Sequence, residues 1–310
     1  MDFSWTKEQQ ALRQSVIAFA KRELNHNLIE RDRHSEFPWE AWKRCAEFGI
    51  QAMTEPESGS DAFSLRTRAV KKGDRYILNG SKTFITNAPV ADVVMVLANV
   101  DPSKGPAGVT GFIIDKGTPG FSISKKLHKM GLRTSPMAEL ALVDCEVPET
   151  NILGQVGSGQ AIFTVSMEWE RACILASHLG AMQRMLEASV RHASTPRGTG
   201  GSGRPVDLSP AIADKIAEMD MRLETARLAL YKAAWLKQQG KHPLREAAIA
   251  KLAVSHACIE TAQAAMEIHG TLGDLTESQF ERQYRDAISG TLYSGTSEIQ
   301  KSIIARWHGL

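Results

Sequence analysis

The sequence lacks several features that mark particular classes of protein. Its 310 residues include only four cysteines, none in a CxxC spacing, which argues against a zinc site and a disulfide-stapled secreted domain. No stretch approaches the roughly 18 apolar residues of a membrane span. The formal net charge is +2, and no basic block is present, so nucleic-acid binding is not expected.

Motifs of common catalytic centres are also missing. No HExxH or other ligand spacing of histidines and no GxSxG elbow occurs, so we expect neither a metal site nor a serine hydrolase. The letters "GTGGSG" at 198–203 fit GxGxxG, but they follow a predicted helix instead of a strand. A flexible inter-helix loop is the better interpretation. The polar start "MDFSWTKEQQ" is unlike a signal peptide, and we expect a cytoplasmic protein.

Residues 1–50 are predicted to form a helical N-terminal domain. Thr6 and Gln9 have the spacing of a capping box, and apolar residues follow at helical intervals. A second short helix is predicted from Pro38 to Phe48 and ends at Gly49.

Residues 51–150 are predicted to form an all-β, barrel-like domain, because alternating apolar residues are separated by glycine and proline. "RYILNGSKTFIT" predicts a hairpin with its turn at Asn79-Gly80. Further strands are predicted in "ADVVMVLANV", "GVTGFIID", "GFSISKKL" and "AELALVDCEV".

Residues 151–310 are predicted to form a C-terminal four-helix bundle, which makes the chain an α+β multidomain protein. One long helix is expected from Gln160 to about Ala193, and a second from Ser209-Pro210 to Gly240. A third runs from Pro243 to His269, and the last begins at Thr296 or Ser297.

Three segments carry groups suited to chemistry. "TEPESGSD" (54–61) gathers hydroxyls and carboxylates at a domain junction, although an ordinary polar turn is the more frequent explanation. In "FITN", Phe84 and Thr86 share one face of a strand, as a flavin ring needs, but an edge-strand aromatic fits equally. In "MEWER", Glu170 is either part of an exposed charge pair or, if buried, a base with a raised pKa.

"TLYSGTSEIQ" (291–300) has the composition of a catalytic or cofactor-binding turn, with an aromatic, hydroxyls and a glycine before a predicted helix. Its central residue, Ser294, is a poor acid or base. If this loop lines an active site, another residue must move the proton.

Taken in order, these segments resemble the acyl-CoA dehydrogenase family over nearly the whole chain. The resemblance rests on the ordered set "TEPESGSD", "NGSKTFITNAPVADV", "GTPGFSISKKLHKMGLRTS", "MEWERACILASHLGAM", "AMEIHGTLG", "YRDA" and "GTSEIQKSIIAR". It implies a helical N-terminal domain, a middle β domain and a C-terminal bundle, with FAD at their junction in a homodimer or homotetramer.

The resemblance also implies the reaction, in which a carboxylate removes the α-proton of an acyl thioester and the β-hydrogen leaves as hydride to FAD. The substrate would be an acyl-CoA or an acyl carrier protein, and an electron-transfer flavoprotein or oxygen would reoxidise the flavin. The FAD contacts that it implies are Met53, Thr54, Ser60, Phe84, Ile85, Thr86, Arg197, Gly270, Thr296 and Glu298. The substrate contacts that it implies are Ser135, Arg171, Tyr293, Ser294, Gly295 and Arg306.

The catalytic base is predicted from a difference between this chain and most members of the family. Most family members carry a glutamate where this chain has Ser294, whereas a smaller group carries it on the long bundle helix, immediately before the position of Arg171. Glu170 occupies that second place. We therefore predict Glu170 as the base; the alternative is that this homologue has lost the chemistry.

Three further departures bear on cofactor and substrate. Most of the family's N-terminal helices are missing between Gly49 and Ala52. In an FAD-contacting loop, Arg197 or Arg204 takes the place of the family's arginine, and Ser202 stands in place of a phenylalanine. Glu267 stands in place of a glutamine, which predicts weaker FAD binding.

"MEWERACILAS" is most similar to members that act on carrier-bound acyl groups in polyketide and peptide biosynthesis. The alternatives to a dehydrogenase are a non-redox homologue that binds an acyl group or partner protein, and a flavoenzyme that oxidises a hydroxyl or amine carbon of a carrier-bound unit.

Overall fold

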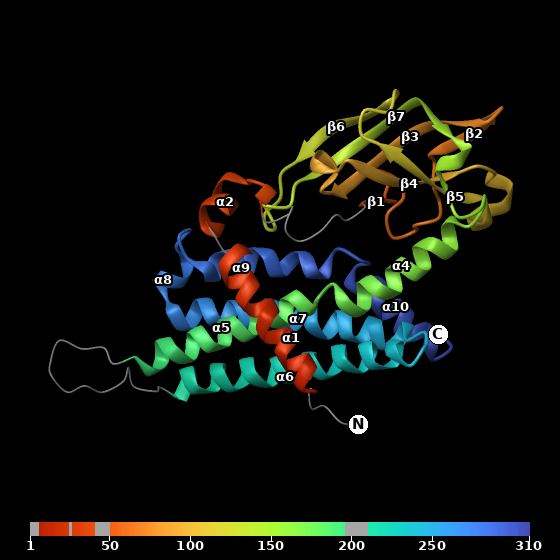
Figure 1. Cartoon of the computed structure of the whole chain (residues 1–310). Helices are drawn as coiled ribbons and strands as arrows, with labels where there is room; N and C mark the ends of the chain where they lie inside the picture. The colour runs from red at the N-terminus through yellow and green to blue at the C-terminus, as the bar shows by residue number, and fades with distance from the viewer. Residues whose placement is uncertain (1–5, 25–26, 41–49, 196–209) are drawn as a thin grey trace, which may run out of the picture.

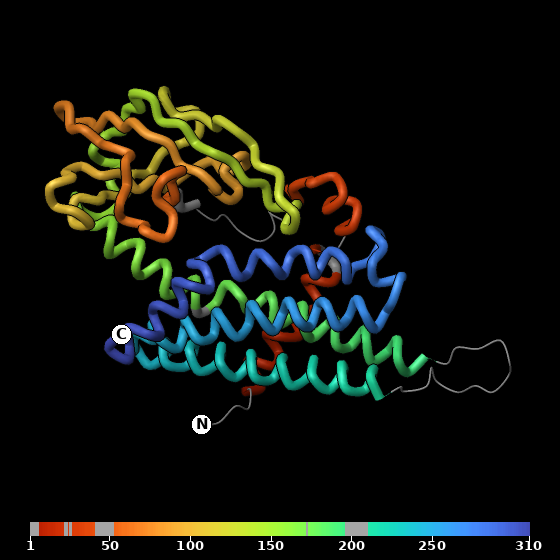
Figure 2. Tube along the Cα trace, turned by 180° about the vertical axis from the view of Figure 1, so that it is seen from behind, coloured from red at the N-terminus to blue at the C-terminus, as the bar shows by residue number. Residues whose placement is uncertain are grey.

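The structure is a computed structural model that describes residues 6–24, 27–40, 50–195 and 210–310. Its β domain lies along one side of a long helical bundle, and helix α1 crosses the bundle surface (Figure 1). The reverse view shows the same two layers, with the bundle helices roughly parallel to one another (Figure 2). None of the described helices is long and apolar enough to cross a membrane.

The N-terminal part contains α1 (Lys7–Phe19), a π-helical turn (Ala20–Leu24) and α2 (Leu28–His34). The predicted capping box is confirmed, since Thr6 and Gln9 exchange side-chain and backbone hydrogen bonds of 2.9 and 3.2 Å. Helix α2 was not predicted. The predicted helix from Pro38 to Phe48 lies mostly outside the described residues.

The predicted β domain is confirmed as one sheet in the order β6-β7-β3-β2-β4-β5-β8, with β1 paired to β4. In this order, β6 and β8 are the two edge strands. Side chains from both halves of the sheet, such as Leu78, Phe112 and Leu140, form one hydrophobic core. The strands are β1 (Ile50–Ala52), β2 (Arg68–Lys72), β3 (Arg75–Thr86), β4 (Val93–Asn99), β5 (Val109–Asp115), β6 (Phe121–Leu127), β7 (Met137–Pro148) and β8 (Ile152–Leu153).

The predicted hairpin at Asn79-Gly80 is wrong. Both residues lie inside the single long strand β3, and the chain instead turns between β2 and β3. Gly80 has φ 153° next to a register shift against β7, and a Cβ there would lie 2.5 Å from the Thr67 hydroxyl. The glycine therefore serves a bulge and a close backbone approach, not a turn.

A buried ion pair anchors the "TEPESGSD" segment on β3. The Lys82 ammonium, which is fully buried, donates to Glu55 Oε1 at 2.7 Å and to the Met53 carbonyl at 3.1 Å. Glu55 also accepts from the backbone N–H groups of Arg66 and Thr67. Burial raises the pKa of Glu55, but Lys82 and these hydrogen bonds outweigh it and hold the pKa below its ordinary value.

The predicted helical bundle is confirmed, but its fourth helix is α9, which was not predicted, instead of α10; α5, α6, α7 and α9 pack around a shared core of Leu, Met and many Ala residues. The helices after the sheet are α4 (Gly159–Cys173), α5 (Ala176–Ser194), α6 (Pro210–Gln238), α7 (Leu244–His269), α8 (Thr271–Asp274), α9 (Gln279–Ile288) and α10 (Ser297–Trp307). Helix α10 begins at Ser297, one of the two predicted starts, and Thr296 is its N-cap.

The predicted long helix from Gln160 to Ala193 is wrong in one respect: it is interrupted at Ile174-Leu175 and forms α4 and α5. At the break, His178 N–H bonds the Leu175 carbonyl in an i,i+3 pattern, so one turn is locally tightened. Leu175 is fully buried, and the apolar spacing continues through the break. Periodicity alone therefore cannot detect it.

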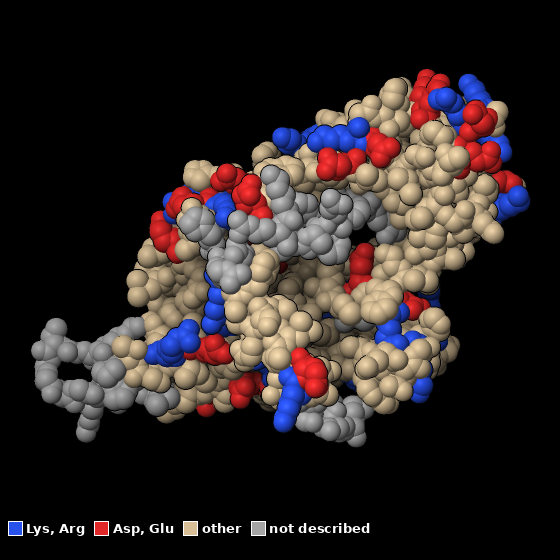
Figure 3. All heavy atoms as spheres, in the orientation of Figure 1, with Lys and Arg blue, Asp and Glu red and all other residues tan. Residues whose placement is uncertain are grey.

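The "YRDA" segment of α9 joins the domains. Asp286 Oδ1 accepts the Leu132 N–H at 2.6 Å, and Arg285 donates to the Met130 carbonyl at 2.7 Å and to Asp32 at 2.6 Å. The loop between β6 and β7 is thereby fixed to the bundle. The molecule is hollowed between the β domain and the bundle (Figure 3).

Breaking the buried pair in the β domain should be costly. We expect Glu55→Gln to lower the free energy of unfolding by about 3–5 kcal/mol, because it leaves the buried Lys82 charge without its counter-charge. Glu149→Gln, which breaks the exposed pair with Lys71, should have a much smaller effect, because solvent screens that pair. Urea unfolding of both variants tests this, and equal costs would contradict the role of the buried pair.

Candidate active site

Glu170 and Ser294, the two alternative positions for a base, lie side by side. The Ser294 hydroxyl donates to Glu170 Oε2 at 2.8 Å. Glu170 comes from the last turn of α4, and Ser294 from the loop that precedes α10. The fold therefore brings together two residues that are 124 positions apart.

The surroundings of Glu170 make it more basic than an ordinary glutamate. Burial raises its pKa above 4.5, while the hydrogen bond from Ser294 and the charge of Arg171 oppose this in part. A carboxylate with a raised pKa can accept a proton from a weakly acidic carbon more readily than an exposed one.

The neighbouring carboxylate, Glu168, has cationic partners, and its pKa is lowered instead of raised. It is buried and bound to Lys237 at 3.1 Å and His242 at 3.2 Å. These contacts hold its pKa below the ordinary value despite the opposing effect of burial. Of the two carboxylates in "MEWER", only Glu170 contacts the predicted substrate loop.

The turn at Ser294-Gly295 is held by donors from three helices. Arg171 Nε donates to the Ser294 carbonyl at 3.3 Å, and Gln300 donates to the Ser294 and Gly295 carbonyls at 3.1 and 3.0 Å. Lys251 Nζ donates to the Gly295 carbonyl at 2.8 Å. Ser294 has φ 54°, a left-handed conformation that a serine adopts only when its surroundings hold it there.

Lys251 and Gln300 hold the turn, and neither was among the predicted site residues. Lys251 is fully buried in α7, and burial together with the charge of Arg171 lowers its pKa to about 8. The available signal was one lysine inside the apolar, alanine-rich stretch "AAIAKLAVSHAC". A charged residue there requires a buried partner.

His178 and Tyr293 lie behind this turn. The Tyr293 hydroxyl is 3.5 Å from His178 Nε2. Burial, and then the charge of Lys251, lower the pKa of His178 to about 4, so its imidazole is neutral at physiological pH. Burial raises the pKa of Tyr293, which therefore stays protonated. Both side chains can only act as neutral hydrogen-bonding and packing groups.

The β domain presents an exposed aromatic ring at the end of β3. Phe84 is 62% exposed and has φ 57°, a backbone conformation unfavourable for a bulky residue. Thr86 is exposed two residues on, whereas Ile85 is buried in the sheet core, so only the backbone of Ile85 can face a ligand. Ser135 donates to Asn87 at 2.8 Å, which places it beside this strand end.

The segment of Met53 and Thr54 lies beside the same strand. The Thr54 carbonyl accepts the Thr83 N–H at 2.8 Å, and Met53 is buried behind it. Ser60 is exposed in the following turn. An exposed ring on strained backbone, with hydroxyls of Thr54 and Thr86 nearby, provides the plane and the donors that a flavin ring requires. The residues present fit FAD.

The other predicted cofactor and substrate contacts that the structure describes lie on the bundle, and Thr296 directly follows the Ser294-Gly295 turn. Gly270 ends α7, about 28 Å from Lys251 along the helix axis. Thr296 and Glu298 form the start of α10, and Arg306 is exposed in its last turn. Arg197 and the neighbouring Ser202 lie outside the described residues.

Glu267, predicted to repel the diphosphate of FAD, already has a partner. It forms an ion pair with Lys215 and accepts from Gln263 at 3.0 Å. These bonds hold its pKa below the ordinary value. Its charge is therefore partly neutralised within the bundle.

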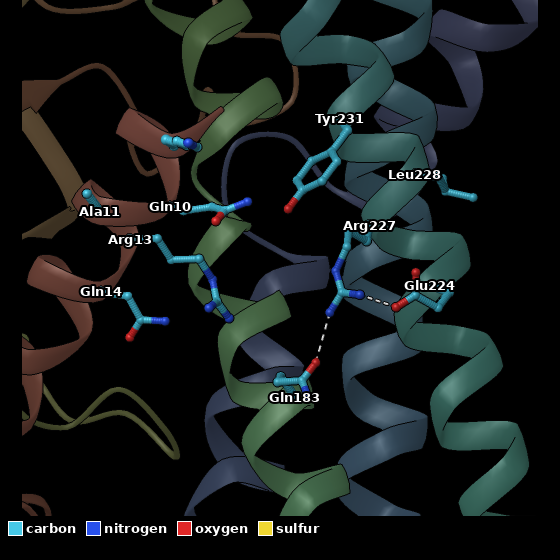
Figure 4. A pocket seen from close by; sticks show the side chains of 10 residues that line it. Gln10, Ala11, Arg13, Gln14, Gln183, Glu224, Arg227, Leu228 and Tyr231 are labelled. Carbon is cyan, nitrogen blue, oxygen red and sulfur yellow. Dashed lines mark hydrogen bonds and ion pairs between the residues drawn. The ribbon is translucent and has the colours of Figure 1, made fainter. Parts of the chain in front are cut away.

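A hollow of about 800 Å³ lies elsewhere on the bundle, between α1, α5 and α6. Gln10 and Arg13 of α1 face Gln183 of α5 and Arg227 and Tyr231 of α6 across it (Figure 4). Arg227 donates to Gln183 at 2.9 Å. None of the residues that we assign to the candidate site lines this hollow.

Comparison with known proteins gives consistent matches. Family models described as the N-terminal, middle and C-terminal domains of acyl-CoA dehydrogenase match residues 6–68, 51–145 and 157–309. An L-prolyl-[peptidyl-carrier protein] dehydrogenase of Pseudomonas fluorescens is 38% identical over 305 residues, which cover 98% of this chain and 77% of that protein.

Two solved structures have nearly the same fold. The prolyl acyl carrier protein oxidase AnaB matches with a TM-score of 0.94 and 36% identity, over 99% of this chain and 100% of the other. PigA with FAD and proline matches with a TM-score of 0.94 and 27% identity, over 100% of both chains. From these matches, the chain belongs to the acyl-CoA dehydrogenase family.

Proposed function

We propose that this chain dehydrogenates the α,β-bond of an acyl thioester, with Glu170 as the base that removes the α-proton. The hydrogen bond between Ser294 and Glu170 carries this proposal, because it places the carboxylate on the loop that the family resemblance assigns to the substrate. FAD, when bound, supplies the acceptor for the β-hydrogen.

Ser294, Lys251 and Arg171 have supporting roles in this proposal. The Ser294 hydroxyl fixes the orientation of the Glu170 carboxylate, and Lys251 fixes Ser294 through the Gly295 carbonyl. Arg171 holds the same turn and keeps a positive charge beside Glu170. Tyr293, Gly295, Ser135 and Arg306 are the further substrate contacts that we propose.

On the cofactor side, Phe84 would cover one face of the flavin, and Thr54, Ser60 and Thr86 would donate or accept hydrogen bonds. Met53 and Ile85 would contribute backbone contacts. Arg197, Gly270, Thr296 and Glu298 remain proposed contacts to the rest of FAD, some of them from the other subunit of a homodimer or homotetramer.

We further propose that the acyl group is carried by a protein, with prolyl as the leading candidate. The support is the names of two relatives above 35% identity, one acting on a prolyl-[peptidyl-carrier protein] and one on a prolyl acyl carrier protein. Turnover of a prolyl carrier protein should exceed that of free acyl-CoA esters of similar size, and equal rates would refute this substrate. Reoxidation with oxygen and with an electron-transfer flavoprotein distinguishes the two expected acceptors.

Removing the base should stop the chemical step without removing the flavin. We expect Glu170→Gln to slow anaerobic flavin reduction by about 10²–10⁴-fold, the range for loss of a general base. The flavin spectrum of the oxidised protein should be unchanged. Glu168→Gln is the control, since that carboxylate is bound to Lys237 and His242. Undiminished reduction in Glu170→Gln would refute the assignment.

The rate should depend on pH through Glu170. The ionised carboxylate is the active form and its pKa is raised, so the rate of flavin reduction should fall as pH decreases through a midpoint above 4.5. Ser294→Ala removes a hydrogen bond that lowers this pKa, and should move the midpoint to higher pH. Stopped-flow rates across pH measure both midpoints; a shift to lower pH would contradict the hydrogen bond.

Lys251 should affect flavin reduction through the Ser294-Gly295 turn, because it binds the Gly295 carbonyl. Lys251→Met leaves the Gly295 carbonyl without this donor, so we expect slower flavin reduction and the same upward shift of the midpoint as in Ser294→Ala. The double variant should show little further change, because both act through one hydrogen bond. Lys71→Met removes an exposed lysine of the β domain that is paired with Glu149, and it should leave the pH midpoint in place.

A further inference from the structure

Strand β6 and the loop that follows it carry an excess of positive charge. Residues 116–138 include no Asp or Glu, but they include Lys125, Lys126, Lys129 and Arg133. Lys125 and Lys126 are exposed, and Arg133 is half-buried. Within the ranges that the structure describes, none of these last three cations forms an ion pair. Figure 3 shows Lys and Arg side chains gathered along β6 on the outer surface of the β domain.

Nearby carboxylates offset only part of this charge. Asp286 interacts with the charge of Lys129, the partly buried lysine of the loop. Glu139 of β7 lies across the strands from Lys125, but the hydrogen bond that it accepts comes from the Thr83 hydroxyl, at 3.5 Å. The exposed lysines of β6 therefore present their positive charge to solvent.

Strand β6 is an edge strand of the sheet. It pairs with β7 alone among the described strands, and all of its residues except Phe121 and Leu127 are exposed. Lysines on an edge strand also prevent non-specific strand pairing. That role does not account for Arg133 or for Met130, which is 50% exposed, because both lie in the loop beyond the strand. The β6 surface, as we call it, consists of Ile123, Lys125, Lys126, Met130 and Arg133.

The strand register places the β6 surface beside the proposed active site. Lys126 pairs with Ala138 of β7, and Ala138 pairs with Ile85 of β3. Because neighbouring strands lie about 4.8 Å apart, Lys126 is about 10 Å from the end of β3 that we propose for the flavin. Arg133 precedes Ser135, a proposed substrate contact, by two residues, which span at most about 7 Å.

The loop part of the β6 surface is held in one conformation. The Leu132 N–H donates to Asp286 at 2.6 Å, and Arg285 donates to the Met130 carbonyl at 2.7 Å. Arg133 Nε donates to the same carbonyl at 3.1 Å. A partner that binds here therefore meets a preformed surface and loses little affinity to ordering of the loop.

We propose that the β6 surface docks the carrier protein that brings the acyl thioester, through an acidic face of that protein. This inference rests on the proposed function, since a carrier-bound acyl group must be delivered beside the active site. The lysines attract a negatively charged partner and speed its encounter with the chain. Ile123 and Met130 supply exposed apolar contact area among the charges.

The kinetic test compares two forms of one substrate, a prolyl-[peptidyl-carrier protein] and the prolyl thioester of N-acetylcysteamine, which has no protein part. Combining Lys125→Glu and Lys126→Glu should raise KM for the carrier-bound form by about tenfold or more, because like charges then face each other. The kcat for that form, and both constants for the small thioester, should not change, because neither lysine belongs to the proposed catalytic or binding residues.

Combining Lys71→Glu and Lys72→Glu gives a matched control. These are also consecutive, exposed lysines of the β domain, but they lie at the end of β2 next to the turn into β3. This variant changes the net charge by the same amount, and its KM for the carrier-bound form should equal that of the wild-type chain. An equal rise of KM in both double variants would overturn the proposal, because it would reflect net charge alone.

Binding of a fluorescently labelled carrier protein to the full chain tests the surface without turnover. Wild-type affinity should fall as salt is added, and the β6 variant should bind about tenfold more weakly with less dependence on salt. If the chain oxidises neither thioester, the proposed function fails, but this measurement still decides the docking surface. Absence of binding, or equal affinity in wild type and β6 variant, would overturn the docking proposal. A defect confined to reoxidation by an electron-transfer flavoprotein would assign the surface to that protein and overturn it as well.

Discussion

The candidate site depends on a turn that would not keep its conformation by itself. Ser294 and Gly295 both have positive φ, and for the serine this costs on the order of 1–3 kcal/mol. Arg171, Gln300 and Lys251 offset that cost by binding the two carbonyls. These bonds hold the Ser294 hydroxyl against the Glu170 carboxylate, whose pKa is raised by burial.

The β domain also contains residues in the left-handed backbone conformation. Phe84, Asn87 and Leu132 all have positive φ, and each lies at a strand end or in the loop that docks on α9. Tertiary contacts hold them: the Asn87 N–H bonds the Pro136 carbonyl at 2.6 Å, and the Leu132 N–H bonds Asp286 at 2.6 Å. The Asn87 contact fixes the end of β3, next to the proposed flavin position, within the β domain, and the Leu132 contact joins the β domain to the bundle.

The sequence predicts the long, regular elements well. Capping residues and glycines placed the starts of α1 and α10 and both ends of α6 and α7 close to their observed positions, because these signals act locally. Asn79-Gly80 misled the prediction, since strand pairing on both sides overrides the turn preference of that dipeptide. The break at Ile174-Leu175 leaves no trace in the apolar spacing.

The site is only partly readable from the sequence. The ordered motifs identify Glu170 and Ser294 as alternatives, but their contact depends on the packing of α4 against the loop before α10. Lys251 has no motif, and its role appears only once its carbonyl partner is known. Arg197 lies outside the described residues, so its proposed contact with FAD stays a prediction.

The central claim is that Glu170 removes the α-proton, and the most direct measurement is exchange of that proton with solvent. The full chain would be incubated anaerobically in heavy water with an acyl thioester that lacks a removable β-hydrogen, and α-deuterium would be followed by mass spectrometry. We predict incorporation by the wild-type chain and almost none by Glu170→Gln. Equal incorporation by both would show that another group is the base.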